Sequence, residues 1–172
     1  MALHFLTSSN ETLDVVVTCD SSVEATEEQR NDYLNSGSLD DLGNVGEDAT
    51  KFKLKALSPS EREEAEVRAG AYTRSELGRL LWVEAPTEPK ERAVWHHGLT
   101  DDEREAMSDY NAYLQRVYIE MIIGSLTHIN GEEATMSMVN NIRPDSNRIQ
   151  TISELVMHIQ RISLLGIEGK SL

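Results

Sequence analysis

The feature that most constrains the fold is a helical pattern over residues 100–131. Thr100 and Glu103 have capping-box spacing, in which each side chain hydrogen-bonds the other residue's backbone N–H. Apolar residues then recur every three or four positions, which is typical of one helix face. Asn130 and Gly131 tolerate the left-handed conformation that ends helices. The pattern predicts one long helix, with an apolar stripe that other segments must cover. The residues of this stripe are Met107, Tyr110, Leu114, Val117 or Tyr118, Met121, Ile122, Leu126 and Ile129.

Shorter helices are expected on both sides of the long one. Ser58 and Glu61 form a capping box with Pro59 at the first helical position. A further box begins at Thr73, and other short helices are predicted at residues 24–34, 90–97 and 131–140. After Pro144 a last helix is expected, and it is the natural partner for the long helix. Its core positions are Ile149, Ile152, Leu155, Val156, Ile159 and Ile162.

Two short segments have the composition of β-strands. Residues 13–18 are rich in valine, and residues 51–56 alternate lysine with apolar residues, as in a strand with one wet face. Residues 3–6 are expected to pair with the first strand as a hairpin. The predicted fold is α+β and mostly α: a small N-terminal β element, made of a hairpin plus one strand, with a helical bundle around one long central helix. We expect two regions, an N-terminal β element with an acidic loop or arm (1–56) and the helical bundle (57–172).

Negative charge is concentrated near the N-terminus. Residues 1–50 contain eleven acidic residues and one base, Arg30, for a net charge of −10, whereas residues 51–172 carry −4. Phosphate backbones repel such a chain, so nucleic acid is not an expected partner. Residues 35–50 have the composition of a long loop. The acidic stretch is either a solvated, partly disordered tether or a segment that docks on a basic partner.

Other features limit the location of the protein. No run approaches the ~18 apolar residues of a membrane helix, and residues 1–10 do not resemble a secretory signal. Cys19 is the only cysteine, so an internal disulfide is impossible and a reducing compartment is expected. The chain is expected to be soluble, without membrane association.

No motif predicts catalysis or a cofactor. His96 and His97 are neighbours and make a poor chelate, although His128 and His158 could meet across the bundle. Residues 166–171 resemble a phosphate-binding loop, but two residues rather than four separate the glycines, and no helix follows. Most carboxylates lie at helix starts, where capping explains them. We therefore expect no enzyme activity, no metal and no cofactor.

One segment resembles a known family. Residues 52–65, F-K-L-K-A-L-S-P-S-E-R-E-E-A, are similar to small morphogenesis proteins of tailed bacteriophages, notably tail assembly chaperones. In that group a short strand of this pattern often precedes a charged helix directly. The resemblance implies a non-enzymatic protein that works through protein–protein contacts. The long acidic insert at residues 20–50 departs from the compact form of the family, and it would suit a virion component whose arm crosses a neighbouring subunit.

The leading hypothesis is therefore a phage structural or assembly protein, either a virion component or a tail assembly chaperone. Its partners would be phage tail or capsid proteins or further copies of itself, in the host cytoplasm during assembly or in the virion. An alternative is an acidic inhibitor that occupies a basic or nucleic-acid-binding site on its partner, and a third is a small hydrolase or metal enzyme built on the histidines. The predicted partner-binding residues are Tyr33, Leu34, Leu39, Leu42, Tyr110, Leu114, Tyr118, Met121 and Arg143.

Overall fold

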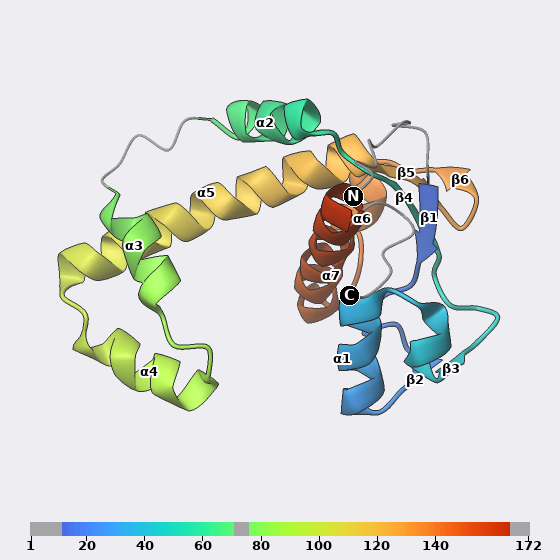
Figure 1. The fold of residues 1–172 in the computed structure, drawn as a ribbon, viewed down its shortest axis with the longest axis horizontal. Coiled ribbons are helices and arrows are strands. Elements are labelled where there is room, and N and C mark those ends of the chain that lie inside the picture. The colour runs from blue at the N-terminus through green and yellow to red at the C-terminus, as the bar shows by residue number, and fades with distance from the viewer. Residues whose placement is uncertain (1–11, 71–75, 166–172) are drawn as a thin grey trace, which may run out of the picture. The chain divides into compact units, whose positions relative to one another are not determined.

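A computed structural model describes residues 12–70 and 76–165 of the chain (Figure 1). The fold is α+β and mostly helical, with a four-stranded antiparallel sheet, a hairpin and a long central helix α5. The predicted fold class is confirmed. Among the described helices, none is both long enough and apolar enough to span a membrane.

The chain divides into two compact units. The sheet unit comprises residues 1–65 and 118–172, and the helical unit comprises residues 66–117. The sequence predicts two regions that meet after residue 56, and this boundary stays a prediction.

The sheet has the strand order β1-β4-β5-β6. Strands β1 (Thr12–Val15) and β4 (Phe52–Lys55) lie close to the two predicted strand segments, and they pair antiparallel with Val15 opposite Phe52. Alternate residues of β4 are buried, because successive side chains point to opposite faces of a sheet. The residues expected to pair with the first strand, 3–6, lie outside the described part of the chain.

Helix α5 (Asp101–Ser125) starts where the capping box predicts. The Thr100 backbone N–H donates to Glu103 Oε2 at 2.8 Å, and the Glu103 N–H donates to Thr100 Oγ1 at 3.3 Å. This helix ends before the predicted stop at Gly131, because the chain turns into β5 (Leu126–Ile129) along the edge of β4.

Asn130 and Gly131 form a hairpin turn rather than a helix end. Both residues have positive φ, 51° and 84°, and they connect β5 directly to β6 (Glu132–Glu133). Two consecutive left-handed residues match the twist of antiparallel strands, and Asn-Gly is the preferred sequence for this turn. The prediction that these residues cap a helix is wrong, since the same backbone preference serves both structures.

The segment between β1 and β4, residues 16–51, is here called the arm. It contains β2 (Val23–Glu24), α1 (Glu27–Ser36), the 3₁₀ helix η1 (Leu39–Leu42) and β3 (Asn44–Val45). Helix α1 starts with a capping box between Thr26 and Gln29 and ends at Gly37, whose φ is 71°. The arm has its own buried cluster: Val16, Val23, Tyr33, Leu42 and Ala49. The stretch predicted as a loop is therefore built around apolar anchors.

The remaining helices of the sheet unit are α6 (Met136–Asn140) and α7 (Asp145–Leu165), together with the first turns of α2 (Pro59–Arg68). Helix α7 packs against α1, α6 and β4, which were not its predicted partners. Five of its six predicted core residues are buried, whereas Ile149 is 61% exposed.

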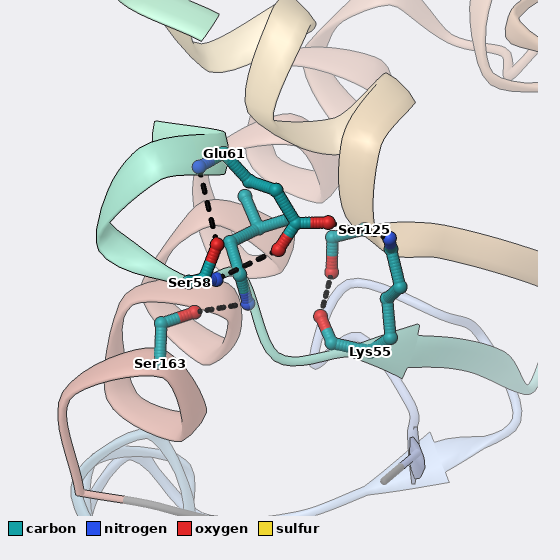
Figure 2. A network of polar contacts seen from close by, with 6 residues as sticks. Lys55, Ser58, Glu61, Ser125 and Ser163 are labelled. Carbon is teal, nitrogen blue, oxygen red and sulfur yellow. Dashed lines mark hydrogen bonds and ion pairs between the residues drawn. The ribbon is translucent and has the colours of Figure 1, made fainter. Parts of the chain in front are cut away.

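Serine side chains fix the start of α2, as Figure 2 shows. The Ser58 N–H donates to Glu61 Oε2 at 2.8 Å, and the Glu61 N–H donates to Ser58 Oγ at 3.2 Å, so this capping box is confirmed. Ser163 on α7 accepts the Leu57 N–H at 2.9 Å. The start of α2 is thus tied to α7 by a buried hydrogen bond.

The helical unit contains α3 (Leu77–Glu84), α4 (Pro89–Gly98) and the first turns of α5. The capping box expected at residues 73–76 falls largely on residues outside the described ranges. The Arg116 Nε donates to the Ala69 carbonyl at 3.0 Å. Among the described residues of the helical unit, few side chains are buried, and they include Ala69, Leu81, Ala85, Leu99 and Val117.

Candidate functional site

Apolar side chains are exposed on the two short helices of the helical unit. On α3, Leu77 is 37% exposed, Leu80 48% and Val83 76%. On α4, Val94 is 74% exposed, and no residue of this helix is buried. These four residues are here called the α3–α4 apolar surface.

The sequence of α3 explains its share of this surface. Leu81 and Gly78 are buried on one side of the helix. Leu77, Leu80 and Val83 recur every three residues and follow one another along a different side. A helix that is apolar on most sides is normally buried on most sides. Within the described part of the helical unit only one side of α3 is buried, so Leu77, Leu80 and Val83 remain exposed.

Aromatic rings lie between α3 and α5 within the helical unit. The Trp82 ring centroid is 6.3 Å from that of Tyr110, at an interplanar angle of 63°, and Tyr110 lies 6.2 Å from Tyr113. Such edge and tilted contacts are favourable for aromatic pairs. Burial is the main cause of the raised Tyr113 pKa, and Glu66 raises it further. Tyr110, a predicted partner-binding residue, thus packs against its own chain, and its contact with Trp82 joins α3 to α5.

The other predicted residues on α5 differ in exposure. Leu114 and Tyr118 are half-buried, whereas Met121 is buried. A buried side chain does not contact a partner in this conformation. Leu114, in the helical unit, and Tyr118, in the sheet unit, therefore remain candidates for contact with a partner. Met121 is part of the core of the sheet unit.

The four predicted residues of the arm also have different environments. Tyr33 and Leu42 are fully buried in the arm cluster, Leu34 is half-buried beside it, and Leu39 is 42% exposed. The Tyr33 hydroxyl donates to the Val16 carbonyl at 2.9 Å and accepts the Val16 N–H at 3.1 Å. Burial raises the pKa of Tyr33 to about 12. Tyr33 and Leu42 hold the arm together and leave only Leu39 well placed for contact.

The arm presents a fixed acidic surface. Helix α1 and the segments beside it carry exposed carboxylates and no exposed arginine or lysine between residues 16 and 50. The one base in this range, Arg30, is directed inward, where it donates to the carbonyls of Thr18 (2.7 Å) and Ala25 (3.2 Å). The exposed carboxylates are Glu24, Glu27, Glu28, Asp32, Asp40, Glu47 and Asp48.

A buried polar row on α7 holds the arm, and the sequence patterns did not single it out. Glu154 accepts the N–H and the hydroxyl of Thr18, each at 2.6 Å, and the Gln150 amide at 2.8 Å. One turn further, His158 lies against the Tyr33 ring with centroids 5.0 Å apart. The available signal was the recurrence of polar residues every three or four positions in an otherwise apolar helix.

Arg143 lines a hollow of about 430 Å³ in the sheet unit. Its guanidinium donates to the Ile142 carbonyl at 2.9 Å and lies 3.6 Å from Asp145, and its side chain is 65% exposed. Cys19 lines the same hollow, with its thiol near Thr151 Oγ1 and the Asn147 carbonyl. Burial is the main cause of the raised Cys19 pKa, which disfavours the reactive thiolate.

The histidines are dispersed. His96 and His97 are exposed on α4, His128 is on β5, and His158 is buried in α7. Residues 12–70 and 76–165 contain no group of three or more His, Cys, Asp or Glu side chains placed to hold a metal ion. The loop at residues 166–171 lies outside these ranges.

The strongest features on the described surface are therefore exposed apolar side chains on α3 and α4 and exposed carboxylates on the arm. Comparisons with protein-family models, with curated proteins and with solved structures found no match.

Proposed function

We propose that this protein is a non-enzymatic structural or assembly protein that acts through protein–protein contacts, of the kind that serves tailed-phage morphogenesis. The observation that carries the proposal is the α3–α4 apolar surface. The strand-then-capped-helix segment at residues 52–65, which resembles tail assembly chaperones, supports the phage assignment.

The proposal follows from the cost of leaving this surface in water. Burying one large aliphatic side chain is worth about 1.5–3 kcal/mol. Four such residues gather on two short helices whose own unit has a small core. A partner that covers them would stabilise the helical unit as well as bind it. The proposed occupant is a second protein chain, because large exposed apolar patches are typical of protein interfaces.

The test is light scattering after size-exclusion chromatography at ~0.1 M and ~1 M salt, combined with binding of a hydrophobic dye. The double variant Leu80→Lys/Val83→Lys places charge on the α3–α4 apolar surface. The matched control is Ile149→Lys/Met157→Lys, which alters two exposed apolar residues of α7. We expect a defined oligomer or strong dye binding in the wild type, retained at high salt and in the control, and lost in the α3 variant.

Two results would contradict the proposal. One is loss of the oligomer or of dye binding in the α7 control but not in the α3 variant. The other is a wild-type monomer at both salt concentrations that binds no more dye than the α3 variant does.

A second candidate function, an acidic inhibitor of a basic partner, is favoured by one observation. The carboxylates between residues 16 and 50 are held on an ordered surface, and the one base in this range, Arg30, is directed inward. Long-range attraction between such a surface and a cationic one speeds association and weakens with salt.

Polylysine is a suitable probe for this second function. Glu24→Gln/Asp32→Asn/Asp40→Asn removes three exposed charges from the arm, and Glu84→Gln/Glu88→Gln/Glu91→Gln removes three from the helical unit. If the arm is the docking surface, the first variant binds polylysine more weakly than the second does. Equal loss in both variants would show only a response to net charge.

A further inference from the structure

The arm leaves the sheet and returns to it at one point. Val15, the last residue of β1, lies opposite Phe52, the first residue of β4, so the two ends of the arm are adjacent. Asp20 closes the base, since its carboxylate accepts the Ser22 and Thr50 N–H groups, each at 2.9 Å. These bonds lower the pKa of Asp20, although burial opposes them. The arm can therefore move as one piece without breaking the strand pairing.

The arm also carries its own core. Its buried cluster consists entirely of residues between 16 and 49, and the Tyr33 hydroxyl binds the Val16 backbone within the arm. A capping box starts α1 and a left-handed Gly37 ends it. These interactions lie within the arm, so they remain possible when it leaves α7.

Polar groups take part in the contact between the arm and α7. Thr18 bonds to Glu154 through its N–H and its hydroxyl. The Arg161 guanidinium lies over Gly37 and occupies the space that a Cβ on this glycine would need. A cation is favourable at this place, because the carbonyl end of a helix carries partial negative charge. Water can replace such bonds at small net cost, whereas it cannot replace apolar packing.

His158 lies at the centre of this contact. The groups that face it are Tyr33 from α1 and Arg161 from its own helix. Arg161 Nη2 is 3.1 Å from His158 Nδ1. Because a guanidinium only donates, Nδ1 is the acceptor, and neutral His158 carries its proton on Nε2. Nε2 is buried without a partner among the described residues.

We propose that the arm is a proton-controlled strap: when His158 takes up a proton, the arm separates from α7 while the sheet remains folded. A proton on Nδ1 would break the bond from Arg161 and place two positive charges in contact. Separation lets water reach both groups.

The direction of the effect follows from linkage. Burial, and secondarily Arg161, lowers the pKa of His158 from 6.5 to about 3 in the closed form. Exposure in the open form restores the ordinary value. Because the open form binds the proton more tightly, acid favours opening. The closed arm is fully stabilised above pH 6.5 and loses stability as the pH falls toward 3.

The Thr18 amide is a direct reporter, since its hydrogen bond to Glu154 joins the arm to α7. Hydrogen exchange measured by NMR gives the protection of this amide, corrected for the intrinsic rate at each pH. With the two pKa values above, opening increases roughly 25-fold between about pH 7 and about pH 5. We expect Thr18 protection to fall by that factor, while the amides of β4 keep theirs. Ordinary carboxylates remain mostly ionised in this range.

Two variants distinguish protonation of His158 from protonation of other groups. His158→Gln cannot take up the proton, so its Thr18 protection should change less than about threefold over the same interval. The matched control, His97→Gln, alters an exposed histidine of α4 and should retain the wild-type response.

Three results would overturn the proposal. They are unchanged Thr18 protection in the wild type, an equal fall in His158→Gln, and a parallel loss at the β4 amides, which would indicate global unfolding. Should His158→Gln not fold, the wild-type ring signals decide. A His158 ring that stays neutral while Thr18 is protected supports the strap, and one that titrates near pH 6.5 with Thr18 still protected overturns it.

Discussion

At the scale of single residues, the arm depends on polar groups that are buried with their partners. Glu154 receives three hydrogen bonds, from the Thr18 N–H, the Thr18 hydroxyl and the Gln150 amide. A buried polar group costs little when it is bonded and much when a partner is lost. Sequence patterns did not select Glu154, because a glutamate in a helix is usually exposed.

Replacing Glu154 with glutamine should therefore destabilise the protein. Glutamine has only one acceptor oxygen, and its NH₂ group replaces the second carboxylate oxygen that accepts a bond from Thr18. At least one of these hydrogen bonds is therefore lost, which lowers the free energy of unfolding by about 1–3 kcal/mol. Urea denaturation measures the loss. Glu133→Gln makes the same change on the exposed strand β6 and should shift the free energy by less than about 0.5 kcal/mol. Equal effects at the two positions would rule out a special role for the buried carboxylate.

Tyr33 makes the stability of the fold depend on pH in the alkaline range. Its pKa is raised to about 12 by burial, from 10 in the unfolded chain. A raised pKa means that the folded state favours the neutral phenol, so this contribution is complete below pH 10 and is lost between 10 and 12. Stability should fall by up to about 1.4 kcal/mol per pH unit in that interval.

Tyr33→Phe provides the comparison for this dependence. It loses the hydrogen bonds to Val16, so it is less stable than the wild type at neutral pH. Its unfolding free energy should nevertheless fall less between pH 10 and 12 than that of the wild type. The same slope in both proteins would contradict the assignment to Tyr33.

At the scale of elements, local sequence determined where helices start. The boxes at Thr100–Glu103 and Ser58–Glu61 involve residues three positions apart, so their bonds form wherever the helix forms. The end of α5 was not determined locally, because residues 126–129 continue the helical period and become a strand only through pairing with β4. The Asn-Gly turn that follows was visible in the sequence, although helix ends also favour it.

Gly131→Ala should test the turn. A Cβ on Gly131 meets nothing within 4 Å, but the residue has a φ of 84°, so the cost is conformational and about 1 kcal/mol. Gly98→Ala is the matched control, since its Cβ also meets open space, at the end of α4, without a positive φ. We expect thermal denaturation to show that Gly131→Ala is less stable than the wild type. Gly98→Ala should be as stable as the wild type or more stable by up to about 1 kcal/mol. If Gly131→Ala is as stable as the wild type, the positive φ at this position does not strain an alanine.

At the scale of the whole molecule, charge is the dominant feature. The net charge is −14, and residues 1–50 contribute −10 of it. Like charges held on a folded surface repel one another and favour the expanded chain. Salt screens this repulsion over distances of about 10 Å at ~0.1 M.

The free energy of unfolding should therefore rise with salt. Between ~0.05 M and ~0.5 M sodium chloride we expect an increase, measured by urea denaturation at each salt concentration. Glu24→Gln/Asp32→Asn/Asp40→Asn removes three of the exposed charges and should show a smaller increase. A free energy that falls with salt would mean that attractive ion pairs, not repulsion, dominate the surface.

Local sequence patterns were sufficient to predict the fold class, the strand segments of β1 and β4, the starts of α2 and α5, and the uneven charge. Each of these depends on residues close together in the chain, through periodicity, capping or composition. The patterns did not identify which apolar residues are covered. Tyr33 and Leu42 were predicted to contact a partner and are buried, while Leu80 and Val83 were assigned no partner-binding role and are exposed.

Only the three-dimensional fold shows which apolar side chains are buried, because their burial depends on segments distant in the chain. Thr18 and Glu154 are 136 positions apart, and Tyr33 meets His158 across a comparable separation. Neither pairing leaves a local pattern. The same reason applies to α3, where an apolar helix face has the same periodicity whether its own chain or another protein covers it.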